Sequence, residues 1–361
     1  MQSRLWNRDR DEACRRLRAF WAGKSLDDRP ALWLVAKNAD YKPAPCPCPK
    51  PKTTMEELNP DYQAWRHHQW LFGNHYLAEA MPGFAPAWGA LVTLTAELSG
   101  GTARLFGDDN DAWIDERPDL WDCPLPVFDP AHPVVKILER CYDRMAETIG
   151  ERGFLYPPMP LDAMTTLSKF LGSERFCIEL IENPDRVKQW SMALENLNVA
   201  MYDHFWRYAE RLGVGGASIC FFAAMHEGRA QATMCDAGVM ISPEMYAEFS
   251  MPVLRRWTGS LDAALYHLDG VCQLRFLDMI CSLPNLRGIQ WAAEPAAGPP
   301  VKWIDTFRML RERGLSLYIG ASVEDALTIT RALGPDGLFF TIGCASREEG
   351  EAVIRAFEKG A

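Results

Sequence analysis

The chain has 361 residues, of which 48% are apolar and 24% are charged, a balance typical of globular enzymes. Its formal net charge of −10 argues against nucleic acid or an anionic membrane as the main partner, because both select basic surfaces. No apolar run approaches the roughly 20 residues that a membrane span needs.

The N-terminal region, residues 1–85, is predicted to be a helical, aromatic-rich extension. Residues 1–20 carry both charge signs and no apolar signal core, which predicts an amphipathic helix and a cytoplasmic protein with free thiols. Residues 59–86 contain six aromatic side chains and three histidines. Because exposed aromatic side chains in such number are unusual, we expect this region to cover the mouth of the domain that follows.

From about residue 150, apolar runs typical of strands alternate with amphipathic helical runs. The predicted strands are RGFLYP, GASICFFAAM, AALYHLD, LRGIQWA, LSLYIGA and GLFFTIG. Between them, Ser242 before Pro243 predicts a helix start, and Ser346 with Glu349 fits a capping box. This alternation predicts an α/β fold, a (β/α)8 TIM barrel over residues 86–361. A doubly wound sheet would usually carry a G-x-G-x-x-G turn, which this sequence lacks.

Polar side chains follow most of the later predicted strands, where the active site of such a barrel forms. We expect the catalytic residues to be Asp236, His226 and His267. Substrate contacts are expected from Asp236, Glu227, Gln290 and Trp291. Asp236 precedes a capped helix, where it could orient a substrate or hold a proton, although a turn-forming aspartate would look the same.

His267 and Asp269 lie two residues apart at a predicted strand end, so their side chains share one face. Together with Cys344 they are acceptable zinc ligands, and a three-ligand zinc keeps one open position for substrate. The spacing alone does not specify a metal site. A hydrogen-bonded His–Asp pair and a separate buried cysteine would explain the same residues.

Several of these stretches together resemble one known family. CDAGVMISPEMYAEFSMPVLRRW, LYHLDG, LRGIQWAAEPAAG and IGCASREEGEAVIRAF, in this order, are similar to the uroporphyrinogen decarboxylase-like superfamily. Within it the chain looks nearest to the corrinoid- and thiol-dependent methyltransferases. The resemblance covers most of residues 85–361 and implies a (β/α)8 barrel.

In that branch a zinc is held by a His-x-Cys pair and a later cysteine. His267 and Cys344 match this pattern, whereas Asp269 stands in place of the first cysteine. The resemblance therefore implies zinc and a corrinoid on a partner protein as cofactors, but a carboxylate is a harder ligand than a thiolate. The decarboxylases themselves hold a polycarboxylate substrate with an early arginine-rich segment, of which this chain keeps Arg29 but not the following arginine pair.

The leading hypothesis is a methyltransferase that moves a methyl group between a small methylated compound or a thiol and a corrinoid on a partner protein. The second is a metal-free decarboxylase or lyase that uses Asp236 and His226. The third is a non-catalytic barrel that binds a small ligand through its aromatic-rich segment, residues 62–88. The methyl donor, the acceptor and the formation of a homodimer remain open.

Overall fold

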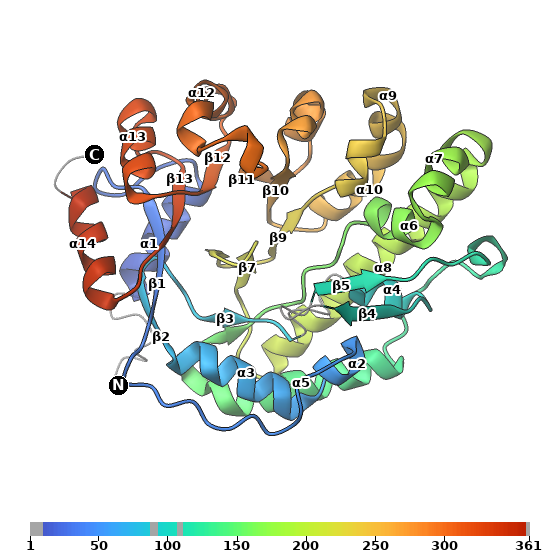
Figure 1. The fold of residues 1–361 in the computed structure, drawn as a ribbon, viewed down its shortest axis with the longest axis horizontal. Coiled ribbons are helices and arrows are strands. Elements are labelled where there is room, and N and C mark those ends of the chain that lie inside the picture. Colours follow the sequence, from blue (N-terminus) through green and yellow to red (C-terminus); the bar gives the residue numbers. More distant parts are fainter. Residues whose placement is uncertain (1–9, 87–92, 107–110, 359–361) are drawn as a thin grey trace.

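The computed structural model describes residues 10–86, 93–106 and 111–358. A seven-stranded, mostly parallel sheet forms its centre, in the order β2-β1-β13-β12-β11-β10-β9, so the protein has a mixed α/β fold (Figure 1). The strands of this sheet are β1 (Ala31–Lys37), β2 (Asn74–Ala78), β9 (Ala230–Thr233), β10 (Ala263–Asp269), β11 (Leu286–Ala292), β12 (Ser316–Gly320) and β13 (Leu338–Gly343). The expected α/β class is therefore confirmed.

The first strand of the sheet, β1, lies parallel to the last, β13, with Leu32 opposite Phe340. Both strands are continuous apolar runs, as expected for strands that are covered on both faces. β2 pairs with β1 in the antiparallel direction. The N-terminal region is therefore part of the main sheet, which differs from the expected division at residue 85. The apolar run that forms β1 follows the charged first helix, α1 (Arg10–Trp21), after a nine-residue connection.

Three shorter strand pairs complete the strands of the described residues. β3 (Gly83–Phe84) runs parallel to β6 (Phe154–Leu155), and β4 (Ala103–Phe106) pairs antiparallel with β5 (Asp111–Ile114). β7 (Ser218–Cys220) and β8 (Ala224–His226) form an antiparallel hairpin. GASICFFAAM is thus a hairpin, not the single strand expected, because the chain reverses at Phe221 and Phe222, whose φ angles are 43° and 69°.

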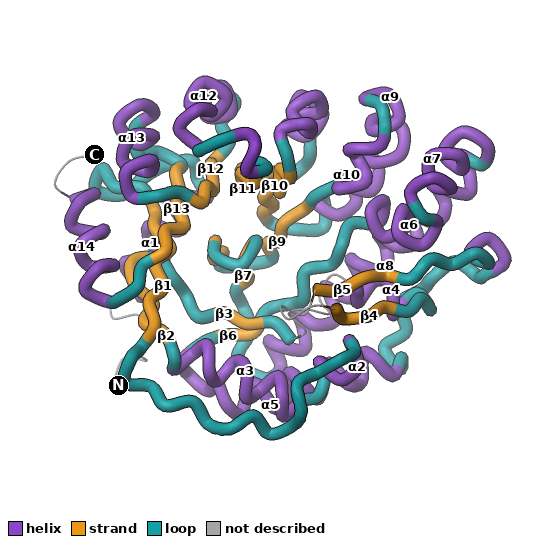
Figure 2. Tube along the Cα trace, viewed as in Figure 1, coloured by secondary structure: helices purple, strands orange, loops and turns teal. Residues whose placement is uncertain are grey.

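Helices surround the strands on the outside (Figure 2). The longer ones are α1 (Arg10–Trp21), α3 (Pro60–Phe72), α5 (Pro133–Ile149), α6 (Ala163–Leu171), α7 (Ser173–Glu182), α8 (Pro184–Arg211), α10 (Met251–Thr258), α12 (Ile304–Glu312), α13 (Val323–Leu333) and α14 (Arg347–Glu358). The predicted caps are present: Ser242 Oγ accepts the Met245 N–H at 3.3 Å, and Ser346 Oγ accepts the Glu349 N–H at 3.2 Å. In the part of the chain that is described, the helices are all too short or too polar to cross a lipid bilayer.

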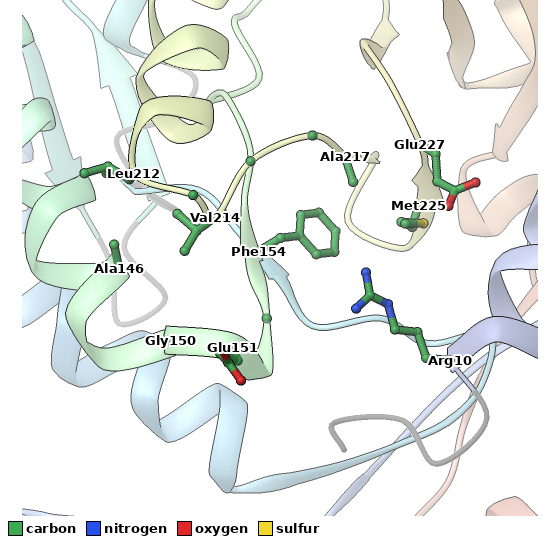
Figure 3. Close-up of a pocket in the computed structure, with 14 residues that line it drawn as sticks. Arg10, Ala146, Gly150, Glu151, Phe154, Leu212, Val214, Ala217, Met225 and Glu227 are labelled. Atoms are coloured by element: carbon green, nitrogen blue, oxygen red, sulfur yellow. The ribbon is translucent and has the colours of Figure 1, made fainter. Parts of the chain in front are cut away.

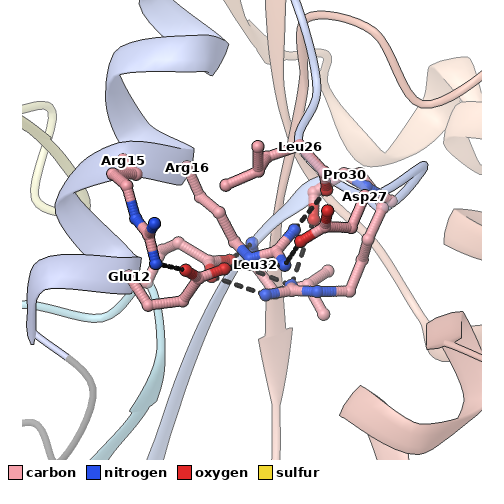
Figure 4. A network of polar contacts seen from close by, with 9 residues as sticks. Glu12, Arg15, Arg16, Leu26, Asp27, Pro30 and Leu32 are labelled. Atoms are coloured by element: carbon pink, nitrogen blue, oxygen red, sulfur yellow. Dashed lines mark hydrogen bonds and ion pairs between the residues drawn. The ribbon is translucent and has the colours of Figure 1, made fainter.

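A buried ion pair between Arg29 and Glu79 joins the start of β1 to the end of β2. Figure 4 shows the polar network around it, which includes Arg16 and Leu32. The Arg29 guanidinium donates two hydrogen bonds to the Glu79 carboxylate, at 3.0 and 2.6 Å, and the Leu32 N–H donates a third at 2.6 Å. Arg29 is 7% exposed and Glu79 is 1% exposed. Arg29, which the family resemblance links to carboxylate substrates, is therefore engaged inside the protein.

Candidate functional site

Four of the expected site residues meet at the carboxyl ends of neighbouring parallel strands. Asp236 follows β9, His267 and Asp269 end β10, and Gln290 lies opposite His267 near the end of β11. Because parallel strands end at the same edge of a sheet, these side chains gather in one region. The charges of His267 and Asp269 both act on the Asp236 carboxyl group, which places the three residues close together.

The structure adds Asp162, which sequence reasoning did not single out. Asp162 is the N-cap residue of α6, where its Oδ1 accepts the Thr165 N–H at 2.9 Å. The Thr165 hydroxyl oxygen accepts the N–H groups of Asp236 and Ala237, at 3.0 and 3.1 Å. A single threonine thereby holds the two aspartates next to each other. The available signal was an aspartate in a capping position after the RGFLYP strand.

Asp162 is buried and Asp236 is half-buried, and each has one buried carboxyl oxygen that is not hydrogen bonded to any described residue. Asp162 Oδ2 and Asp236 Oδ1 have no hydrogen-bond partner among the described residues. Burial, followed by the charge of Asp236, raises the pKa of Asp162 from 3.8 to about 7. Burial also raises the pKa of Asp236. The charge of Asp269 adds to this rise, while His267 and Lys169 lower the pKa of Asp236. Because like charges this close do not ionise together easily, the pair keeps a proton near neutral pH.

His267 is held from two sides. Its Nδ1–H donates to Gln290 Oε1, and its ring stacks on Phe221 with 4.0 Å between the ring centroids and 18° between the planes. In a neutral imidazole, donation from Nδ1 leaves Nε2 as a proton acceptor. The ring is therefore fixed in one orientation beside the carboxyl pair.

A third buried carboxyl group lies next to the pair. Glu195 on α8 is 3% exposed, and its Oε2 accepts the Ala163 N–H at 3.3 Å. Burial, followed by the charge of Asp162, raises the pKa of Glu195 from 4.5 to about 8. The site is thus built from carboxyl groups that ionise late.

We expect the free energy of unfolding to decrease as the pH rises from about 4 to about 8. The folded-state pKa values of Asp162 and Glu195 are raised, so the folded protein binds more protons than the unfolded chain in this window. Their stabilising contribution is complete at low pH and is lost as the pH passes the folded-state values. Glu195→Gln should flatten this dependence in thermal unfolding at about pH 5 and about pH 8.

The control for this measurement is Glu182→Gln, because Glu182 is an exposed glutamate at the end of α7. It should keep the slope of the wild-type protein. A Glu195→Gln protein with the wild-type slope would show that Glu195 does not hold a proton in the folded state.

His226 is not part of this site. It lies on β8. Its neighbour Asp262 directly precedes β10, and its neighbour Arg287 is the second residue of β11. His226 is therefore near the amino ends of these strands. The expectation that Asp236, His226 and His267 line one cavity is therefore corrected. The reversal at Phe221 and Phe222 is the reason, because it sends the second half of the predicted strand back toward the amino end.

Glu227 is at the same distant end. Its carboxylate forms an ion pair with Arg18 on α1 and lines a cavity of about 550 Å³ together with Arg10 (Figure 3). This cavity is bordered by the glycine-rich turn at residues 213–216. The expected substrate contact of Glu227 with the Asp236 site is therefore corrected as well.

Trp291 also points away from the site. It is 5% exposed and packs against Trp303 and Phe307, with ring centroids 5.2 and 5.1 Å away. Since successive residues of a strand face opposite sides, Trp291 belongs to the layer between sheet and helices, whereas Gln290 faces the site. The expected substrate contact is retained only for Gln290 and Asp236.

The expected zinc ligands are not assembled. Within the described ranges, no group of three or more His, Cys, Asp or Glu side chains is placed to hold a metal ion. Cys344 follows β13, which β11 and β12 separate from His267 on β10. Its Sγ lies 3.6 Å from the Val35 carbonyl oxygen on β1, on the far side of β13 from His267. The donor set His267, Asp269 and Cys344 does not fit a zinc ion.

Comparison with known proteins adds no assignment. No protein-family model matches this chain, and no curated protein sequence matches it either.

Proposed function

We propose that the protein is a methyltransferase that removes a methyl group from a small, uncharged methylated compound, with the Asp162–Asp236 pair as the general acid. The bond between the methyl carbon and its oxygen, nitrogen or sulfur atom breaks, and the methyl carbon bonds to an acceptor. The acceptor we propose is either a thiol or a corrinoid on a partner protein. The corrinoid would supply a methyl-accepting metal. The heteroatom takes the proton of the pair, and water returns a proton to the carboxylate.

The buried carboxyl pair is the observation that carries this proposal. A general acid works best when its pKa lies near the operating pH, and burial, with the charge of Asp236, raises the pKa of Asp162 toward this range. Asp236 lies between Asp162 and the strand ends, where its side chain is a neighbour of His267. It can therefore pass the proton of the pair to a substrate bound there. His267 Nε2 can accept a hydrogen bond from the substrate or from the acid. No step in this scheme runs through zinc.

The charge of the site favours methyl transfer over the decarboxylase alternative. Asp162, Asp236 and Asp269 lie together and would repel a carboxylated substrate. Arg29 is bound to Glu79. Lys169 is near the pair, but its Nζ lies 4.7 Å from the centre of the Trp113 ring. A polycarboxylate needs several cations, so an uncharged substrate suits this site better.

The non-catalytic alternative does not account for the unpartnered oxygens of the carboxyl pair. Burying Asp162 and Asp236 with unpartnered oxygens costs stability, and such costs are typical of sites that perform chemistry. We therefore place this alternative last. Part of its proposed binding segment, which includes Trp88, lies outside the described residues.

We further infer that the strands close into a (β/α)8 barrel. The parallel pairing of the first strand, β1, with the last, β13, supports a closed barrel. The parallel pair β3 and β6 also supports it, because both strands come after β1 in the chain. β1, β3, β6 and β9 to β13 would supply the eight strands. The carboxyl-end placement of Asp162, Asp236 and His267 agrees with the usual position of a barrel active site.

The direct test is an assay of methyl loss from uncharged methyl ethers and thioethers, compared with methylamines, which are cations near neutral pH. Reduced cobalamin and a simple thiol serve as acceptors, and mass spectrometry detects the demethylated product. Formation of this product in the presence of enzyme and acceptor, at a rate that depends on Asp236, is expected. Release of carbon dioxide from carboxylated substrates without any methyl loss would favour the decarboxylase.

Cys344→Ala is expected to retain turnover within about twofold of the wild-type rate. Cys344 is separated from His267 by two strands and contacts the Val35 carbonyl group, so it contributes to packing only. The same preparation should keep its activity after treatment with a strong chelator. Loss of activity in both experiments, together with zinc bound in a one-to-one ratio, would restore the metal hypothesis.

A further inference from the structure

A second cavity, of about 280 Å³, lies where β1, β2 and β3 meet α3 and the tip of the β7–β8 hairpin. Its walls are mainly aromatic, and among the described residues they include the side chains of Trp33, Trp70, Tyr76, Phe84, Tyr156 and Phe222. Two of these residues, Trp70 and Phe222, are unusually exposed for large apolar side chains, at 45% and 40%. Exposed aromatic side chains beside a cavity mark an entrance for an apolar ligand.

The polar groups of this cavity already have partners inside the protein. The Tyr76 hydroxyl donates to the Trp70 carbonyl oxygen at 2.9 Å, and Arg66 forms an ion pair with the buried Glu57. Burial lowers the pKa of His67 to about 4, so this imidazole is neutral near pH 7. The cavity therefore presents ring faces, which suit an uncharged planar group.

The hairpin tip lies between the cavity and the candidate site. Phe222 lines the cavity, Phe221 stacks on His267, and the two phenylalanine rings are 4.9 Å apart. The Tyr318 hydroxyl anchors the tip by donating to the Phe221 carbonyl oxygen at 3.0 Å. A group bound against Phe222 thus lies one aromatic ring away from His267.

The backbone at this tip is strained. Phe221 and Phe222 have φ angles of 43° and 69°, which bulky residues rarely adopt. The loop between β7 and β8 has three residues, 221–223, and positive-φ positions in such hairpin loops are usually held by glycine or asparagine. Two phenylalanines held here at a cost in stability indicate that their rings, rather than the turn, are needed.

We propose that this cavity binds the aromatic ring of the substrate and that the substrate is an uncharged aryl compound. The ring lies between Trp33, Trp70 and Phe222, and its methylated substituent points toward Phe221, the ring that stacks on His267. An apolar cavity of about 150 Å³ accepts benzene, so about 280 Å³ accepts a ring with one or two small substituents. The inference rests on the proposed methyl transfer for the identity of the reacting group, but the binding of the ring can be tested separately.

The test uses para-fluoroanisole as the probe and fluorine NMR to measure its dissociation constant. Phe222→Gly is expected to raise this constant about tenfold, because it removes one ring of the cavity wall. Glycine tolerates the φ angle of 69°, so the protein should unfold at the same or a higher urea concentration. Trp70→Ala, at the exposed rim, should weaken binding in the same way. Ile181→Ala is the control, since Ile181 is 70% exposed and does not line the cavity.

The outcomes separate this inference from the proposed function. No binding of the probe to the wild-type protein, or equal binding to the wild-type, Phe222→Gly and Trp70→Ala proteins, overturns the inference. Efficient demethylation of methanol or trimethylamine without aryl binding overturns it too, but leaves the methyltransferase intact. Ring binding that depends on Phe222 and Trp70, without methyl loss from any donor, supports the cavity and removes the methyltransferase.

Discussion

Asp236→Asn is expected to lower the turnover number by about 10²- to 10⁴-fold, the usual contribution of a general acid. Asparagine has almost the same shape as aspartate and leaves the Asp236 N–H contact with Thr165 unchanged. It removes the proton that the leaving heteroatom needs. It also removes a buried carboxyl group with an unpartnered oxygen, so the protein should be at least as stable as the wild type.

The pH dependence distinguishes loss of an acid from a structural defect. The reaction needs the protonated pair, so the wild-type rate should fall as the pH rises above about 7, where Asp162 loses its proton. Asp162→Asn removes a like charge beside Asp236, which should lower the pKa of Asp236 and move this decline to lower pH. A merely structural role of Asp162 would lower the rate without moving the decline.

Asp278→Asn is the matched control, because Asp278 is an exposed aspartate on α11 (Leu277–Cys281) that pairs with Arg313. It should retain the wild-type rate and pH profile. If Asp236→Asn also retains full turnover with every substrate that the wild type uses, the carboxyl pair is not the acid.

The regular part of the fold could be predicted from the sequence because strand and helix signals agree there. The runs AALYHLD, LRGIQWA and GLFFTIG all form strands, and Ser242 and Ser346 cap the helices that were expected to start at them. Apolar alternation and capping are local properties, so a sequence carries them fully. Because these strands could be predicted, so could the position of Asp236, His267 and Gln290 at their carboxyl ends.

The irregular parts could not be predicted from local patterns. The turn at Phe221 and Phe222 has none of the glycine or asparagine that signals a hairpin, so His226 and Glu227 were expected at the wrong end of the strands. Asp162 is separated from its strand by residues 156–161, a buried apolar loop that hides the strand end. These tertiary packing effects override the local signal.

Arg29 shows that a motif residue can serve the fold alone. The resemblance to uroporphyrinogen decarboxylases would assign it to carboxylate binding, but only the structure reveals Glu79, fifty positions later, as its partner. Arg16 on α1 adds a longer contact to Glu79, at 3.8 Å. The pair fixes the start of β1 against the end of β2 and α1, and therefore the edge at which the main sheet begins.

Glu79→Gln is expected to lower the free energy of unfolding by about 3 to 5 kcal/mol, because it leaves the Arg29 guanidinium buried without a counter-charge. The measurement is urea unfolding followed by circular dichroism. Replacing both partners, as Arg29→Met with Glu79→Leu, should recover most of the loss, since well-packed apolar side chains replace a buried ion pair with little net cost.

The matched control is Glu227→Gln, which makes the same chemical change in an exposed ion pair with Arg18. Water solvates both partners there, so the unfolding midpoint should stay close to that of the wild type. Equal midpoints for Glu79→Gln and Glu227→Gln would mean that the interior around Arg29 is solvated. In that case Arg29 would again be available to a carboxylated substrate, and the charge argument against decarboxylation would lose one of its supports.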